Sequence, residues 1–176
     1  RDAQESRGLG DVYKRQIFNL LGPLCNPAKV KYQAMGIFNS DFLEKQIKVL
    51  FELGLKSAMV FHGEDGLDEI TTTTNTKVFQ FINRGEINCY EINPNELEIP
   101  LSNLSDLKGG SPKENAQIIL RILKNEKGPK RDIVILNAAA GIFISGKSKS
   151  LKEGISLARK SLDSGSAYEA LLKIQS

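Results

Sequence analysis

The chain has 176 residues, of which 40% are apolar and 26% charged, and its formal net charge is +3 at pH 7. This composition suits one domain with a substantial core, and so small a charge does not by itself indicate nucleic-acid binding. The longest apolar run, residues 133–144, is too short for a bilayer, so we expect a soluble protein with no membrane partner. Two cysteines that are far apart and lack a histidine partner suggest reduced thiols and therefore a cytoplasmic protein.

The first sixteen residues differ from the rest of the chain. Residues 1–16 follow neither a helical nor a strand period. They lack the apolar segment of a secretory signal, and they contain three acids, which transit peptides avoid. The stretch GLGDVYKRQ resembles a translated adaptor. We therefore expect residues 1–16 to be a non-native leader and residues 17–176 to carry the fold.

Helix signals begin in the next third of the chain. Residues 41–53 carry apolar side chains at helical spacing, with Asp41 and Glu44 in capping-box register and Gly54 just past the end. A Ser-x-x-Glu pattern predicts three further helix starts. The pairs are Ser111 with Glu114, Ser150 with Glu153, and Ser166 with Glu169, and Pro112 adds a proline at the first helical position.

Strand signals lie mostly between the first two of these helices. Residues 57–63 are predicted to form a buried parallel strand, and 32–38 are a further candidate. Residues 77–82 and 87–92 are rich in β-formers and are joined by a hairpin-like NRGE connection. Strands alternating with helices indicate an α/β domain with a central sheet flanked by helices. Residues 133–144 fit either a strand or a buried helix.

The stretch HGEDGLDE, residues 62–69, is the main candidate for chemistry, because it follows a predicted buried strand. Its four carboxylates would repel one another, and a divalent cation such as Mg²⁺ would relieve that repulsion. The alternative is an acidic loop before a short helix, which spacing alone favours. The four acids are Glu64, Asp65, Asp68 and Glu69.

Other polar and sulfur-containing residues have simpler interpretations. His62, the single histidine, is expected to be a hydrogen-bonded structural residue. Asn137, inside an apolar run, is expected to be a satisfied core polar group. Cys25 and Cys89 lack a nearby cysteine or histidine partner and are expected to be reduced, small buried side chains. The TTTTNT stretch from Thr71 is expected to be a polar loop.

Five blocks of the sequence, taken in order, are similar to the second half of the anthranilate phosphoribosyltransferase family. They are IFNLLGPLCNPA, HGEDGLDE, LKGGSPKENAQIIL, GPKRDIVILNAAAGIFISGKSKSLKEGI and LDSGSA. The resemblance implies transfer of a phosphoribosyl group from phosphoribosyl pyrophosphate to the amine of anthranilate, with release of pyrophosphate, in tryptophan biosynthesis. It also implies a nucleoside-phosphorylase-like α/β fold, here incomplete, and a helix at 133–144.

The same resemblance implies particular site residues and partners. The family's metal-binding Asp-Glu pair falls on Asp68 and Glu69, which implies a Mg²⁺ cofactor, and the full-length enzyme is expected to be a homodimer. The family's Gly-Thr-Gly-Gly-Asp phosphate loop does not occur in this sequence, so we expect the chain to be inactive alone. Arg15 falls on an anthranilate-contacting arginine, although it lies in the expected leader and Gln16 replaces the threonine that follows it.

A second interpretation is a non-catalytic relative of the same family that binds nucleic acid. It depends on a basic cluster near the C-terminus, which a solvated helix face explains equally well. Salt-dependent DNA binding would favour this alternative. The cluster consists of Lys147, Lys149, Lys152, Arg159 and Lys160.

Overall fold

The computed structural model describes residues 20–175, which form a mixed four-stranded sheet in the order β1-β2-β3-β4. Strands β1 (Tyr32–Gly36) and β2 (Ser57–Gly63) are parallel. Strands β3 (Thr76–Phe81) and β4 (Asn88–Ile92) continue the sheet in antiparallel pairings. All four strands were predicted, and the α/β class is confirmed.

The connections explain why the sheet is mixed. A helical crossover joins β1 to β2, as parallel neighbours require. The loop 64–75 between β2 and β3 contains no helix, so β3 turns back antiparallel to β2. The predicted NRGE hairpin joins β3 to β4, and Asn83 and Arg84 adopt left-handed φ values of 50° and 57° there.

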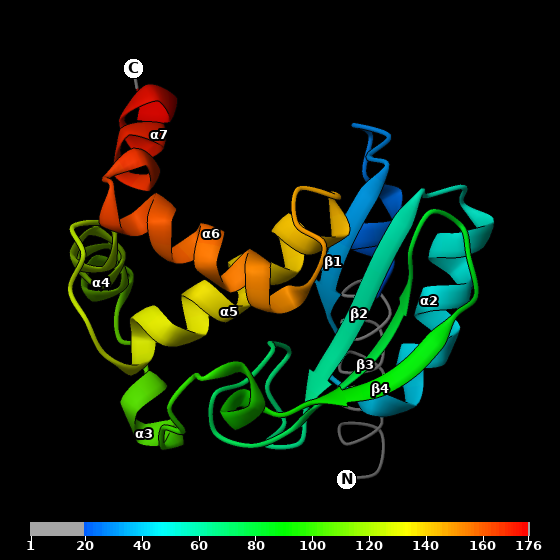
Figure 1. Ribbon diagram of the computed structural model, residues 1–176, viewed down its shortest axis with the longest axis horizontal. Helices are drawn as coiled ribbons and strands as arrows, with labels where there is room; N and C mark the ends of the chain where they lie inside the picture. Colours follow the sequence, from blue (N-terminus) through cyan, green and yellow to red (C-terminus); the bar gives the residue numbers. More distant parts are fainter. Residues whose placement is uncertain (1–19, 176) are drawn as a thin grey trace, which may run out of the picture.

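Helices cover both faces of this sheet, with α2 on one side and α5 and α6 on the other (Figure 1). The α-helices are α2 (Leu43–Glu52), α3 (Leu104–Leu107), α4 (Pro112–Leu123), α5 (Pro129–Ile144), α6 (Leu151–Asp163) and α7 (Ser166–Gln175). Single 3-10 turns are η1 (Gly22–Cys25), η2 (Ser40–Phe42) and η3 (Pro94–Leu97). The helix implied by the resemblance over residues 133–144 is present and is the larger part of α5.

The predicted helix starts hold with two corrections. The Ser111 and Glu114 capping box is present at α4. The Ser150 hydroxyl accepts a bond from the Glu153 amide at α6, 3.2 Å away. Asp41 does not cap the first helix, because Asn39 accepts a bond from the Asp41 amide at 2.9 Å and begins the 3-10 turn η2. Helix α7 begins at Ser166 itself, rather than after it.

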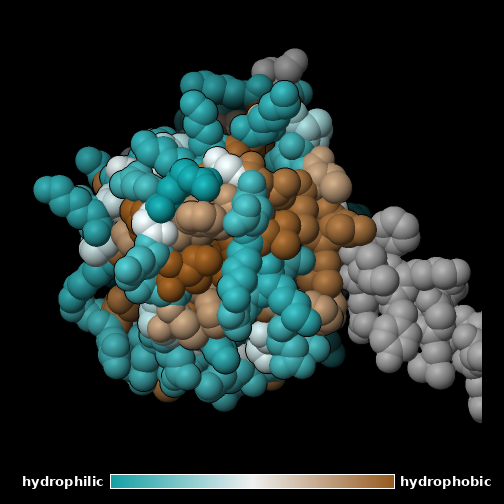
Figure 2. All heavy atoms as spheres, turned by 90° about the vertical axis from the view of Figure 1, so that its right-hand side faces the viewer, coloured by the Kyte–Doolittle hydropathy of each residue, from teal (hydrophilic) through white to brown (hydrophobic). Residues whose placement is uncertain are grey.

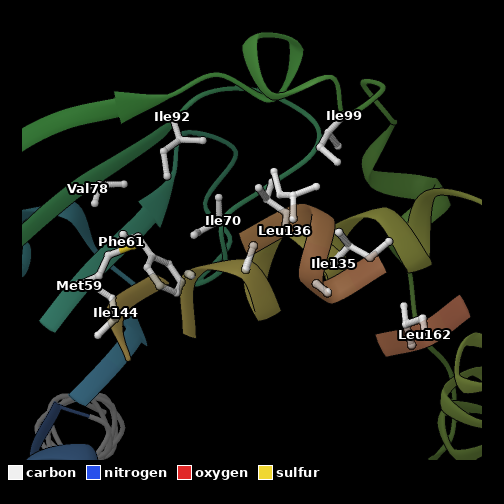
Figure 3. Packing of buried hydrophobic residues seen from close by; sticks show 14 of the residues in the cluster. Met59, Phe61, Ile70, Val78, Ile92, Ile99, Ile135, Leu136, Ile144 and Leu162 are labelled. Atoms are coloured by element: carbon white, nitrogen blue, oxygen red, sulfur yellow. The ribbon is translucent and has the colours of Figure 1, made fainter. Parts of the chain in front are cut away.

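Strand alternation divides the core into two clusters. Met59 and Phe61 of β2 pack with α5, whereas Ala58 and Val60 face α2. Figure 3 shows the α5 cluster, in which Ile70 lies between side chains of the sheet, such as Phe61 and Ile92, and Leu136 of α5. Ile70 is fully buried, so the loop after β2 is anchored in the core.

Apolar side chains also remain on the surface. Figure 2, seen from the side of α2, shows apolar surface interrupted by hydrophilic side chains. Val49 and Leu53 of α2 are among the exposed large apolar residues. Within residues 20–175, no helix is long and apolar enough to cross a membrane.

Both cysteines are free, as predicted, but the prediction that they are buried is wrong. Cys89 lies on β4, an edge strand whose described residues, apart from Ile92, are exposed or half-buried. Cys25 ends the turn η1, which contains no buried residue. Their positions at the margins of the fold explain their exposure.

Candidate metal centre

The acidic loop begins where the parallel strands β1 and β2 end, which is the edge of an open sheet where ligands collect. A tight turn starts it. The Gly66 amide donates to the Gly63 carbonyl at 2.9 Å, and the Gly63 amide donates to the Leu67 carbonyl at 2.9 Å. Gly66 has a φ of 90°, a conformation that favours glycine.

Asp65 points into this loop and organises it. Its carboxylate accepts bonds from the Leu67 amide at 3.1 Å, from the Thr71 hydroxyl at 2.6 Å and from the Thr73 hydroxyl. Partial burial acts to raise the pKa of Asp65, but the hydrogen bonds from Thr71, Thr73 and Leu67 outweigh it and lower the pKa. Asp65 is therefore an internal acceptor of the loop.

The threonine stretch in the second half of the loop 64–75 is not the simple polar loop that was predicted. Thr71, Thr72 and Thr76 are fully buried. The Thr76 hydroxyl accepts a bond from the Thr71 amide at 3.0 Å, and the Thr72 and Ser102 hydroxyls are 2.7 Å apart. A run of hydroxyl side chains a few residues after Asp65 was the available signal, since such side chains bond to nearby backbone and carboxylate groups.

Asn137 of α5 holds the end of the acidic loop. Its Oδ1 accepts from the Ile70 amide at 2.9 Å, and its Nδ2 donates to the Ile70 carbonyl at 2.9 Å. The Nδ2 also donates to the Ile133 carbonyl at 3.0 Å, within the helix. The prediction that Asn137 is a satisfied polar group is confirmed, and its partner is the residue directly after Glu69.

His62 has the structural role that was predicted. Its Nδ1 lies 2.7 Å from the carbonyl oxygen of Ile37, which follows β1. The Ile37 amide in turn donates to the Phe61 carbonyl at 2.8 Å. These contacts join the ends of β1 and β2 beneath the loop.

The four acids therefore occupy different environments. Asp65 is turned inward, and Glu64 accepts a long bond of 3.4 Å from the Thr74 hydroxyl. Asp68 and Glu69 are exposed, and no hydrogen-bond or ion-pair partner for either carboxylate occurs among residues 20–175. The geometry leaves this adjacent pair facing solvent.

The charges of this pair suit a cation. Although Glu69 is solvent-accessible, burial by its surroundings raises the pKa of its carboxyl, and the negative charge of Asp68 raises it further. Within the described part of the chain, no group of three or more His, Cys, Asp or Glu side chains is arranged to hold a metal. Two carboxylates fit Mg²⁺, which takes its remaining ligands from phosphate oxygens and water.

Two other predictions concern different parts of the chain. Arg15 and the expected leader, residues 1–16, lie outside the described residues. In the basic cluster near the C-terminus, Lys152 forms an ion pair with Glu98 at 2.6 Å, and Arg159 donates to the Glu98 carbonyl at 3.3 Å. Part of the cluster is thus engaged within the protein, which does not favour the nucleic-acid alternative.

Comparison with known sequences identifies the relatives of this chain. The family described as "Glycosyl transferase family, a/b domain" matches residues 8–168, a range that starts inside the expected leader. The anthranilate phosphoribosyltransferase of Caldanaerobacter subterraneus subsp. tengcongensis is 51% identical over 160 residues, which cover 91% of this chain and 47% of that relative. The chain spans about half the length of the curated relatives it matches.

Solved structures agree with this comparison. Anthranilate phosphoribosyltransferase from Thermus thermophilus is 42% identical with a TM-score of 0.82, covering 89% of this chain and 46% of that one. The Saccharomyces cerevisiae enzyme, described in complex with PRPP and Mg, is 25% identical with a TM-score of 0.78, covering 94% and 50%. The resemblance inferred from the five sequence blocks is confirmed, and the chain belongs to the glycosyl transferase family, a/b domain.

Proposed function

We propose that this chain is part of an anthranilate phosphoribosyltransferase and carries its Mg²⁺-binding acidic loop. The reaction transfers the phosphoribosyl group of phosphoribosyl pyrophosphate to the amine of anthranilate and releases pyrophosphate, a step of tryptophan biosynthesis. The observation that carries the proposal is the exposed Asp68 and Glu69 pair at the carboxyl ends of β1 and β2, in a chain 51% identical to an enzyme of that name.

The chemistry explains why such a pair is useful. Anthranilate is a weak nucleophile, so the rate depends on substrate positioning and on stabilising the departing pyrophosphate. Asp68 and Glu69 would hold the Mg²⁺ ion, which when bound neutralises charge on the phosphate groups. The anchored backbone on either side of the pair keeps both carboxylates at the sheet edge.

The remaining parts of the proposal concern the rest of the enzyme. We assign residues 17–176 to the C-terminal part of the α/β domain and residues 1–16 to a leader. The phosphate-binding loop would come from a segment absent from this sequence, so the chain alone is expected to be inactive. Arg15 stays a prediction for contact with the anthranilate carboxylate, and homodimer formation stays a prediction for the full-length enzyme.

The test compares the chain alone with residues 17–176 joined to the preceding half of the Caldanaerobacter relative. Anthranilate fluorescence would be followed with phosphoribosyl pyrophosphate and Mg²⁺. We expect turnover from the joined protein only. Replacing both Asp68→Asn and Glu69→Gln should reduce kcat/KM by at least about 100-fold, because removing one strong transition-state contact typically costs that much.

Glu64→Gln is the matched control, since it removes a carboxylate charge from the same loop without touching the pair. Its kcat/KM should stay within about threefold of the unchanged protein, corresponding to less than about 0.7 kcal/mol. A folded joined protein with no turnover would refute the activity. Unchanged turnover in the double variant would refute the metal assignment and leave the activity standing.

A further inference from the structure

We propose that Asn137 and Gly36 are positioning residues that hold the backbone on either side of the Asp68 and Glu69 pair, so that both carboxylates reach one divalent cation. The inference rests on the proposed function, because it takes this pair as the metal ligands. Neither residue contacts the cation in this proposal. Each acts through the peptide backbone of the loop.

Asn137 restrains the chain directly after Glu69. Its side-chain amide bonds to both the N–H and the C=O of Ile70 at 2.9 Å, which fixes the orientation of that residue's backbone as well as its distance. A third bond to the Ile133 carbonyl holds the amide itself in one rotamer. The helix α5 that carries Asn137 is well packed, since Ile135, Leu136 and Ala139 are fully buried.

Gly36 restrains the loop at Asp68. The end of β1 passes so close to the loop that a β-carbon on Gly36 would overlap the carbonyl of Asp68. The overlapping atoms would belong to the backbone, which cannot rotate away as a flexible side chain does. Any larger residue at position 36 would therefore displace Asp68 from the sheet edge.

Together these contacts counter the repulsion within the pair. Two adjacent carboxylates, such as those of Asp68 and Glu69, repel each other, and an unrestrained loop would separate them. Anchors at Gly36 and at Ile70 limit that separation before any ion binds. Residues that orient metal ligands in this way typically change metal affinity by about 10- to 100-fold when they are replaced.

The experiment uses Mn²⁺ alone as the probe and the 176-residue chain as the protein. NMR spectra of the ¹⁵N-labelled chain would be recorded during Mn²⁺ addition, because paramagnetic broadening reports even weak binding near a given amide. Four variants would be compared with the unchanged chain, each checked by circular dichroism. They are Asn137→Ala, Gly36→Ala, Asn115→Ala and the double variant with Asp68→Asn and Glu69→Gln.

Asn115→Ala is the matched control. The Asn115 side chain makes the same two-way contact with a backbone residue, since its Oδ1 accepts from the Gly110 amide at 2.8 Å and its Nδ2 donates to the Gly110 carbonyl at 3.1 Å. That contact lies at the start of α4, outside the acidic loop. Mn²⁺ affinity should therefore be unchanged in this variant.

We expect broadening centred on Asp68 and Glu69 in the unchanged chain, an affinity about 10-fold weaker in Asn137→Ala and in Gly36→Ala, and no localised broadening in the double variant. The Ile70 amide should also exchange with solvent faster in Asn137→Ala. If Asn137→Ala fails to fold, Gly36→Ala decides the matter. Unchanged Mn²⁺ affinity in the folded variants would overturn the positioning role alone. Absence of localised broadening in the unchanged chain, or its persistence in the double variant, would overturn the metal assignment and, with it, this proposal.

Discussion

Replacing Asp65 with Asn tests whether this carboxylate organises the acidic loop. The substitution keeps the shape of the side chain, and one oxygen still accepts from the Leu67 amide. In the unchanged chain the other oxygen accepts from the hydroxyls of Thr71 and Thr73; in the variant it is replaced by an NH₂ group, which can only donate. The Thr71 oxygen already accepts from the Thr73 amide at 3.0 Å, so the buried hydroxyl cannot easily exchange its role.

The expected loss follows from these contacts. Hydrogen bonds to a charged group contribute about 1.5–3 kcal/mol each. Because Asp65 is only half-buried, we discount two lost bonds to about 2 kcal/mol of unfolding free energy in total. For a chain of this size that corresponds to a melting temperature lower by about 4–8 °C. Differential scanning calorimetry at pH 7 measures it.

Glu64→Gln is the control, since Glu64 is exposed and has only a 3.4 Å contact with Thr74. It should change stability by less than about 0.5 kcal/mol. The pH dependence provides a second check. Because the pKa of Asp65 is lowered in the folded chain, its contribution is complete above about pH 5 and is lost as the pH falls below about 4. The difference in melting temperature between Asp65→Asn and the unchanged chain should therefore shrink toward about pH 3. If Asp65→Asn melts at the same temperature as the unchanged chain at pH 7, the stabilising role of this carboxylate is refuted.

Two further predictions concern packing and titration. Gly154→Ala should lower the free energy of unfolding by about 1–3 kcal/mol, because a β-carbon there would lie 2.8 Å from the Ala139 carbonyl oxygen. Gly141→Ala, with no heavy atom within 4 Å of its β-carbon, should instead raise the free energy of unfolding by up to about 1 kcal/mol. Urea unfolding measures both changes, and the same sign for both variants would contradict this prediction. Burial raises the pKa of Tyr90 to about 12, so Tyr90→Phe should leave the phenolate absorbance near 295 nm almost unchanged up to about pH 11, whereas loss of a full tyrosine signal by that pH would contradict it.

Elements that depend on local signals were predicted closely from the sequence. Strand β2 has the bounds that were predicted, and the capping box of Ser111 and Glu114 forms as expected. Gly54 adopts a φ of 83° just past α2. These features depend on a few neighbouring residues, because capping, turn formation and strand periodicity are decided within one or two turns of chain.

Features that depend on distant residues were missed or left open. One local feature was also missed, because Asn39, two residues before Asp41, caps the 3-10 turn η2, whereas α2 has no side-chain cap. The exposure of Cys89 follows from the place of β4 at the edge of the sheet. The role of Asp65 depends on threonines that fold back onto it after the turn, which no local period indicates.

The candidate metal centre likewise combines features that the sequence predicts with features that depend on the tertiary structure. The sequence by itself determined that four acids follow a buried strand, and the resemblance selected Asp68 and Glu69 among them. Only the tertiary structure decided that Asp65 turns inward. It also decided that the backbone of Ile70 is held by Asn137, which lies 67 residues after Ile70 in the chain. The physical reason is that hydrogen bonds between segments distant in sequence form only when the packing of β1, β2 and α5 brings their partners within reach.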